Sequence, residues 1–158
     1  MRLTRFTDLA LRVLMLLATR PAGELTTVAE IAARIGWTHN HVVKVVHQLG
    51  RRGWVLNRRG RSGGVELSPD SRALRLGDVV RALEEDLPLV DCADPACGIA
   101  PGCRLPGILN GGLEAFYAEL NRFTLADLAG PGDFDALFAG ARVIPIRPQT
   151  SSRPAAGR

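Results

Sequence analysis

The chain has 158 residues, 46% of them hydrophobic, and a formal net charge of +4. This is enough for one compact domain of ordinary size with a short segment in addition, and the basic balance makes nucleic acid the first partner to consider. The longest clean apolar run near the start of the chain, Val13–Ala18, is too short for a signal core or a membrane span, so we expect a cytoplasmic protein with no membrane partner.

Three helices are predicted in the first third of the chain, because apolar residues recur there at helical spacing. We expect Thr7 or Asp8 to cap the first helix, Thr27 to cap the second in a capping box with Glu30, and Thr38 to cap the third. The second and third helices, joined by a short glycine-containing turn, form a helix-turn-helix signature. The three helices are expected over residues 7–19, 27–35 and 39–49.

A wing is predicted directly after the helix-turn-helix. Trp54–Leu56 and Val65–Leu67 have the composition of two strands, and the loop between them, residues 57–64, is basic and rich in glycine. This loop also matches the G-x-S-x-G pattern of hydrolases, but that pattern requires a strand-to-helix turn and a later His. No His follows His47, so we expect no enzyme.

The second half of the chain predicts a dimerisation region. A loop rich in Pro, Gly and Cys separates two further helices, and the second of these has too many apolar positions for a lone exposed helix, which favours a homodimer. The expected fold is mainly α with a small β-wing: a winged helix-turn-helix plus a long C-terminal dimerisation helix. The helices are expected over residues 75–85 and 107–128, with the loop over 88–106. The expected segments are a DNA-binding domain over 1–74, the cysteine loop and dimerisation helices over 75–129, and a disordered tail over 130–158.

A basic stretch without acidic residues covers the recognition helix and the wing. No Asp or Glu occurs from Ile31 to Val65, whereas seven Arg or Lys and three His do. Such a stretch is typical of a phosphate-binding surface, and polar residues early in a recognition helix can reach base edges; the alternative is an ordinary solvated helix face. The predicted contacts with double-stranded promoter DNA are Thr38, His39, Asn40, His41, Lys44, Arg51, Arg58, Arg59, Arg61 and Ser62.

The cysteines form the sharpest motif of the sequence. Cys92, Cys97 and Cys103 lie in a turn-rich segment that can curl three sulfurs toward one centre, and thiolates suit iron–sulfur clusters, zinc or copper(I). A structural zinc site would require a fourth Cys or His nearby, which the sequence does not provide. The residues favour an iron–sulfur cluster whose remaining ligand comes from elsewhere. Ordinary loop cysteines and a redox disulfide stay open as alternatives.

Several motifs in combination resemble the Rrf-type winged-helix transcription regulators, and within them the nitric-oxide-sensing repressors. The motifs are the three-cysteine loop and the stretches Arg5–Arg12, Ala32–Ile35, Asn40–Val46 and Gly60–Gly64. The resemblance covers about residues 1–129. It implies a homodimer with one cluster per subunit, which is 4Fe–4S in some members and 2Fe–2S in others; we expect 4Fe–4S here, with 2Fe–2S as the alternative. It also implies that Asp8 of the partner subunit is the fourth ligand, whereas the sequence alone favours Asp8 as a helix cap.

The function implied by this resemblance is transcriptional repression controlled by nitric oxide. The repressor would release promoters of nitric-oxide detoxification genes when its cluster reacts with the gas. Another branch of the family uses a His three residues after the third cysteine, and Pro106 at that position argues against the same ligation here. A regulator of the same fold that senses iron–sulfur or redox status, and a thiol switch without a cluster, are the alternatives.

Overall fold

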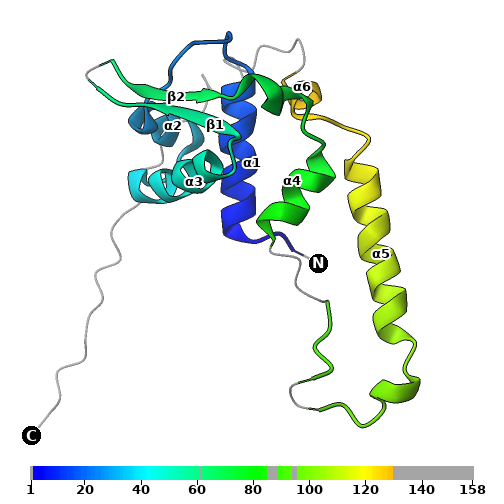
Figure 1. Ribbon diagram of the computed structural model, residues 1–158. Helices are drawn as coiled ribbons and strands as arrows, with labels where there is room; N and C mark the ends of the chain where they lie inside the picture. The colour runs from blue at the N-terminus through cyan, green and yellow to red at the C-terminus, as the bar shows by residue number, and fades with distance from the viewer. Residues whose placement is uncertain (1, 61, 85–88, 94–95, 130–158) are drawn as a thin grey trace, which may run out of the picture.

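The computed structural model describes residues 2–60, 62–84, 89–93 and 96–129 (Figure 1). Within these ranges, no helix has the length and apolar character that a membrane span requires. Arg61, a predicted DNA contact, and the predicted tail over 130–158 lie outside the described residues. The helices and strands are α1 (Arg5–Ala18), α2 (Val28–Ile35), α3 (His39–Arg51), β1 (Val55–Arg58), β2 (Gly64–Leu67), α4 (Leu76–Leu83), α5 (Leu105–Leu120) and α6 (Leu125–Leu128), with short 3-10 turns at Pro69–Ala73 and Ala100–Gly102.

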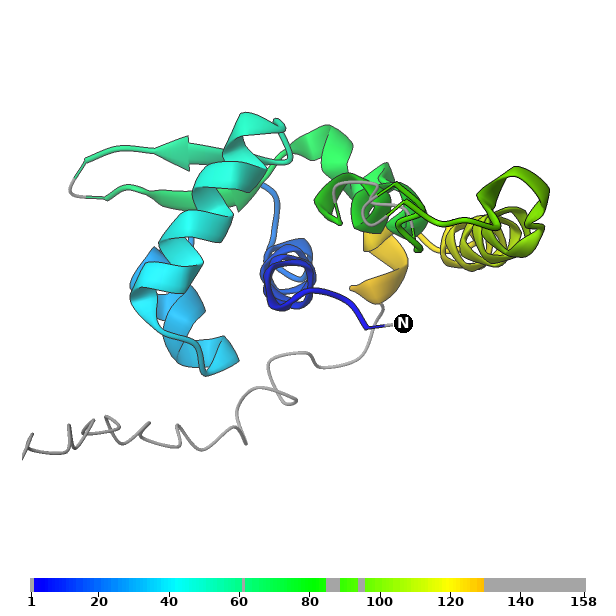
Figure 2. The same ribbon diagram turned by 90° about the horizontal axis from the view of Figure 1, so that it is seen from below.

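Helix α1 lies at the centre of the fold. It contacts α2 and α3 on one side and α4 and α6 on the other (Figures 1 and 2). The apolar stripe predicted for the first helix is buried, with Leu9, Val13, Leu16 and Leu17 at most 2% exposed. Removing a side chain of this size from water stabilises the fold by about 1.5–3 kcal/mol. The apolar faces predicted for the third and fourth helices are buried as well, which confirms the mostly helical core.

The wing is an antiparallel hairpin that is joined to the helical core. β1 pairs with β2, with Val55 opposite Leu67. Thr26 and Val65 exchange two backbone hydrogen bonds of 2.9 Å, which attach the linker between α1 and α2 to the edge of β2. The predicted wing is confirmed, although β1 extends as far as Arg58 and the loop is therefore shorter than expected.

Helix α1 begins earlier than the sequence pattern indicates, so neither Thr7 nor Asp8 is its cap. Oγ1 of Thr4 accepts a hydrogen bond of 3.2 Å from the backbone N–H of Thr7, and Thr7 itself is buried. Asp8 lies in the first turn, with Oδ1 2.8 Å from Nε of Arg12. The apolar periodicity starts at Leu9 and cannot reveal a polar turn that precedes it.

The single helix predicted over 107–128 is two helices in the structure. α6 begins after Thr124, which forms a capping box with Asp127, and these hydrogen bonds hold the pKa of the Asp127 carboxyl below its ordinary value. Two backbone hydrogen bonds of 3.0 Å tie Phe123 and Leu125 to the segment before and at the start of α4. Leu125 continues the apolar pattern, but it is buried in the common core beside α1 and not along α5.

Helix α5 packs against α4 and stands away from the rest of the core (Figure 2). Arg81 of α4 forms an ion pair with Glu114 of α5 and lies 4.2 Å from the ring centroid of Tyr117. The hydrogen bond from Arg81 holds the pKa of the Glu114 carboxyl below its ordinary value. Tyr117 is the only fully buried residue of α5: Leu105 and Ile108 are exposed in the isolated chain, and the other large apolar side chains of the helix are half-buried.

Candidate nucleic-acid interface and cysteine loop

The exposed face of α3 carries the predicted base contacts. Gly36, with φ of 69°, ends α2 in the left-handed conformation and allows the tight turn into α3. Thr38 occupies the N-cap position, as predicted, but its side chain makes no capping hydrogen bond and instead lies 2.8 Å from Nδ1 of His41. His39, Asn40, His41 and Lys44 are all exposed, so the structure brings them together on one accessible surface at the start of α3.

Several cations on this side of the molecule have no acidic partner. Lys44 and Arg51 on α3 and Arg59 in the wing loop are exposed and form no ion pair with any residue that the structure describes. Ser62 in the same loop is exposed as well. Cations without an internal partner are available to phosphate, because binding DNA would break no existing ion pair.

Arg58 differs from the other predicted DNA contacts. Its guanidinium lies 2.9–3.0 Å from Oε1 of Glu66 on the neighbouring strand, and the Glu66 side chain is only 8% exposed. This pair neutralises an acidic group that the wing buries, so Arg58 has a structural role within the hairpin. The sequence does not reveal this pairing, because it depends on the register of the two strands.

We expect Arg58→Gln to destabilise the folded chain, because it leaves the buried carboxylate of Glu66 without its cationic partner. The cost should be about 1 kcal/mol, since the guanidinium itself is largely solvated. Arg59→Gln is the matched control, with no ion pair among the described residues to lose. Chemical denaturation of both variants checks this; equal midpoints would contradict the structural role of Arg58.

Two arginines that the sequence did not single out fix the helices in place. Arg72 donates hydrogen bonds of 2.8 and 2.7 Å to the carbonyls of Ala18 and Arg20, which close the C-terminal end of α1. Arg52 donates to the carbonyl of Ala82 on α4, and its guanidinium lies 5.7 Å from the ring of Trp54. Both side chains donate hydrogen bonds to backbone carbonyls, and neither interaction can be predicted without the tertiary structure.

The three cysteines lie on a loop that backbone hydrogen bonds link into consecutive turns. The N–H of Cys97 donates to the carbonyl of Cys92 at 3.2 Å, and Ala100 connects Cys97 to Cys103 through bonds of 3.1 and 3.3 Å. All three thiols are free; Cys97 is exposed and the other two are half-buried. Soft, accessible sulfur donors on a turn-rich loop fit an iron–sulfur cluster chemically.

The described residues do not assemble a complete metal site within one chain. No three His, Cys, Asp or Glu side chains among them lie close enough together to hold a metal ion. Asp8, the fourth ligand implied by the resemblance, lies on α1 and is paired with Arg12. The donor set therefore suits a cluster, but its closure requires rearrangement of the loop, a ligand from a second chain, or both.

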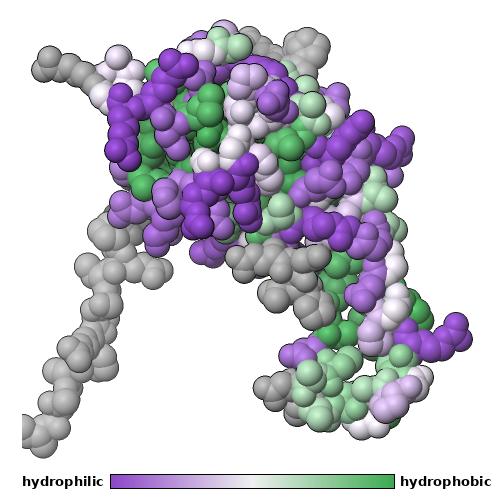
Figure 3. All heavy atoms as spheres, in the orientation of Figure 1, coloured by the Kyte–Doolittle hydropathy of each residue, from purple (hydrophilic) through white to green (hydrophobic). Residues whose placement is uncertain are grey.

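Apolar side chains are exposed beside this loop and along the start of α5. Ile99, Leu105 and Ile108 are 71%, 51% and 67% exposed. Figure 3 shows hydrophobic surface gathered at the lower end of the molecule, where the loop and the beginning of α5 lie. Large exposed apolar side chains grouped in this way mark a surface for association with another protein chain.

A winged helix with a cationic recognition face, followed by a cysteine loop and an exposed apolar helix, defines a transcription regulator of the winged-helix class. The chain belongs to the Rrf2 family of iron-dependent transcriptional regulators, whose model matches residues 3–131. Regulators of this family bind DNA and are typically dimeric.

Solved structures of regulators show the same fold. CymR, the global cysteine regulator of B. subtilis, is 24% identical, with a TM-score of 0.65 over 84% of this chain and 99% of CymR. Staphylococcus aureus CymR is 21% identical, with a TM-score of 0.65 over 82% of this chain and 99% of that one. T. potens IscR is 20% identical, with a TM-score of 0.63 over 90% of this chain and 93% of IscR. At these identities the likeness establishes the winged-helix fold.

Proposed function

We propose that this protein is a homodimeric, cytoplasmic, DNA-binding repressor that senses nitric oxide through one iron–sulfur cluster per subunit, as the NsrR-type repressors do. The cluster is proposed to be 4Fe–4S, with 2Fe–2S as the alternative. The observation that carries the proposal is the pairing, in one chain of the Rrf2 family, of an exposed cationic recognition face with three free thiols on one loop. The regulated genes would be those of nitric-oxide detoxification.

The DNA-binding step is assigned to α3 and the wing. In this proposal Asn40 pairs with the edge of an adenine and Lys44 reaches a guanine or a phosphate in the major groove. Arg59 and Ser62 in the wing loop, with Arg61, would contact the backbone or the minor groove. A dimer would present its two α3 helices about 34 Å apart, one turn of the duplex.

The cluster is assigned to Cys92, Cys97 and Cys103, with Asp8 of the partner subunit as the fourth ligand. When bound, the cluster would supply iron that reacts with nitric oxide. Carboxylate is a weaker ligand than thiolate for such iron, so Asp8 of the partner subunit would hold the cluster less firmly than the three cysteines. Through Asp8, the state of the loop in one chain would control the position of α1 in the other.

The contacts at the start of α1 offer a route from the loop to the recognition helix. Oε1 of Glu84, at the end of α4, accepts hydrogen bonds of 2.9 and 3.1 Å from the N–H and hydroxyl of Thr4, the cap of α1. The cysteine loop follows Glu84 in the sequence, and α1 packs directly on α3. In this proposal a displacement of the loop would act on α1 through Glu84 and change the orientation of α3.

The proposal is tested by measuring DNA binding of anaerobically prepared protein while nitric oxide is added. The duplex is one that the protein itself selects from a random-sequence pool. We expect nitric oxide to remove a coupling free energy of roughly 3–4 kcal/mol between the cluster and DNA binding. The Kd for DNA should then rise by two to three orders of magnitude. Undiminished binding after the cluster spectrum has changed would overturn the sensor function. Lys44→Gln should reduce the salt dependence of binding by about one phosphate contact, whereas Arg122→Gln, in the turn that follows α5, should leave it unchanged.

A second candidate is a thiol switch without a cluster. Cys97 is exposed, and its backbone is hydrogen-bonded to that of Cys92, so a disulfide between the two would require movement of the loop alone. Iron and acid-labile sulfide analysis of the anaerobic protein separates the two functions. Protein without iron whose DNA binding responds to a thiol oxidant would favour the switch.

A further inference from the structure

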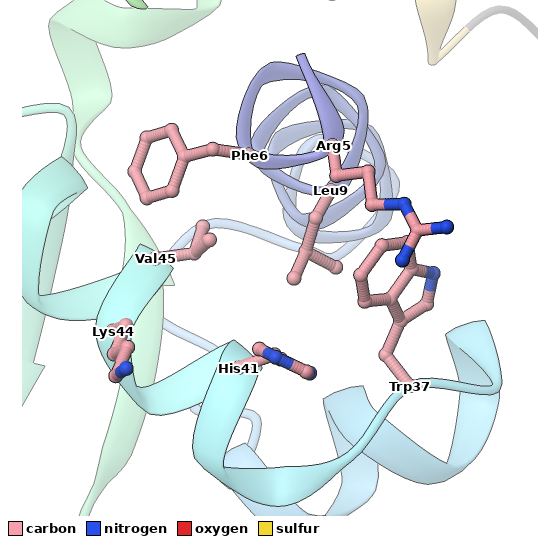
Figure 4. Close-up of a pocket in the computed structure, with 7 residues that line it drawn as sticks. All are labelled: Arg5, Phe6, Leu9, Trp37, His41, Lys44 and Val45. Atoms are coloured by element: carbon pink, nitrogen blue, oxygen red, sulfur yellow. The ribbon is translucent and has the colours of Figure 1, made fainter.

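A small pocket opens between the first turn of α1 and the start of α3. Its volume is about 150 Å³, and it is lined by Arg5, Phe6, Leu9, Trp37, His41, Lys44 and Val45. Leu9 and Val45 point into the space between the two helices, while Phe6 and Trp37 stand on opposite sides of it (Figure 4). In other proteins an apolar cavity of about 150 Å³ accepts one benzene-sized molecule.

The rim of the pocket is cationic and polar. Arg5 and Lys44 are exposed and form no ion pair with any described residue, and the lining contains no acidic residue. His41 meets the edge of Trp37 at a centroid distance of 5.9 Å, and its Nδ1 is engaged by the hydroxyl of Thr38. A ligand in the pocket therefore meets apolar side chains and two cations that stand on opposite sides of the lining, Arg5 near Trp37 and Lys44 on α3 (Figure 4).

This combination selects a chemical class of ligand. The floor favours a single ring or a short branched alkyl group, because the volume accommodates about six carbon atoms. The guanidinium of Arg5 matches the geometry of a carboxylate, and Lys44 adds a second positive charge. From the two features together we infer that the pocket binds a small amphipathic carboxylate: a monocarboxylic acid whose apolar part is one ring.

The location of the pocket gives such a ligand a consequence for DNA binding. Trp37, His41, Lys44 and Val45 belong to α3 or to the turn that precedes it, and Lys44 is also assigned to DNA above. A carboxylate bound at Lys44 competes with a phosphate for the same charge. The lining contains no cysteine, so its occupancy can be tested in protein that contains no cluster and in the absence of DNA.

The test uses cyclohexanecarboxylate, which does not absorb at the wavelengths of tryptophan fluorescence. In a Trp54→Phe background the emission of Trp37 should change saturably, with a Kd on the order of a millimolar. Cyclohexanecarboxamide, which has the ring without the charge, and acetate, which has the charge without the ring, should bind more weakly. Saturation-transfer NMR on the unmodified chain provides a second readout of ring contact.

Variants distinguish recognition of the charge from general attraction to a basic protein. Arg5→Gln and Lys44→Gln should each weaken binding of cyclohexanecarboxylate by about two- to fivefold, as is usual for exposed charge pairs. Arg2→Gln, which removes an exposed cation that is not part of the lining, should leave the Kd unchanged. Absence of a saturable signal by both readouts overturns the inference, as does equal affinity for the amide or an equal effect of Arg2→Gln.

Discussion

Cys97→Ser should abolish retention of iron and sulfide by the anaerobically prepared protein and, with it, the response of DNA binding to nitric oxide. The hydroxyl of serine is a poor ligand for iron compared with a thiolate, and Cys97 lies between the other two cysteines along the loop. Because Cys97 is exposed, its replacement removes no packing from the core. Iron and sulfide per chain, with the visible spectrum, measure the outcome.

Two controls separate ligation from damage to the loop. Ala96→Ser adds a hydroxyl beside Cys97 without removing a thiol, and it should retain iron. Asp8→Ala should lower the amount of iron that the protein retains, or the stability of the cluster to nitric oxide. Arg12→Gln is the control, because it breaks the same ion pair but preserves the carboxylate. That pair is exposed and contributes only about 0.3–0.5 kcal/mol, so unfolding cannot account for a difference between the two variants. Full iron content in Cys97→Ser would remove the basis of the proposed sensor.

Gly77→Ala should destabilise the chain by about 1–3 kcal/mol, the usual cost of overpacking a tightly packed site. Gly77 is buried on α4 where α4 packs against α5, and an added Cβ would collide with the carbonyl oxygen of Tyr117 and with the side chain of Asn121. Neither can move freely, because Asn121 accepts a hydrogen bond of 3.0 Å from the N–H of Asp78 and donates one of 2.9 Å to its carboxylate. Thermal and denaturant unfolding measure the effect.

A glycine-to-alanine substitution at Gly111 should have the opposite effect on the stability of the chain. Gly111 lies on the surface of α5, and a Cβ there would meet nothing within 4 Å. Gly111→Ala should therefore stabilise the helix by up to about 1 kcal/mol, through the higher helix propensity of alanine. If both variants changed stability in the same direction and by the same amount, the close approach of α4 and α5 at Gly77 would be contradicted.

Much of the fold could be predicted from local sequence patterns. Leu9, Val13, Leu16 and Leu17 recur at the helical period, and the structure buries all of them, because periodicity reports which face must leave water. Gly36 ends α2 in the left-handed conformation that glycine adopts most easily. The site residues on α3 were predictable for the same reason: once the buried face is known, the polar face is exposed.

Other features could not be predicted, because they depend on which segments meet in space. The apolar pattern through Leu125 does not reveal that the chain turns after α5 and returns to the core, since both arrangements bury a leucine at the same spacing. The pairing of Arg58 with Glu66 likewise depends on the register of the wing hairpin. A run of arginines in the sequence does not show which one is internally neutralised.

The sequence by itself determined three features: the winged-helix fold, a recognition helix without Asp or Glu, and three cysteines on one loop. Helix periodicity, turn residues and sulfur chemistry are local properties, so they can be recognised without the tertiary structure. Only the tertiary structure decided which cations are free for phosphate, where α5 ends, and that Arg5 and Lys44 line the same pocket. Those outcomes depend on contacts between residues far apart in the chain, whose free energies arise from packing and desolvation after the helices have assembled.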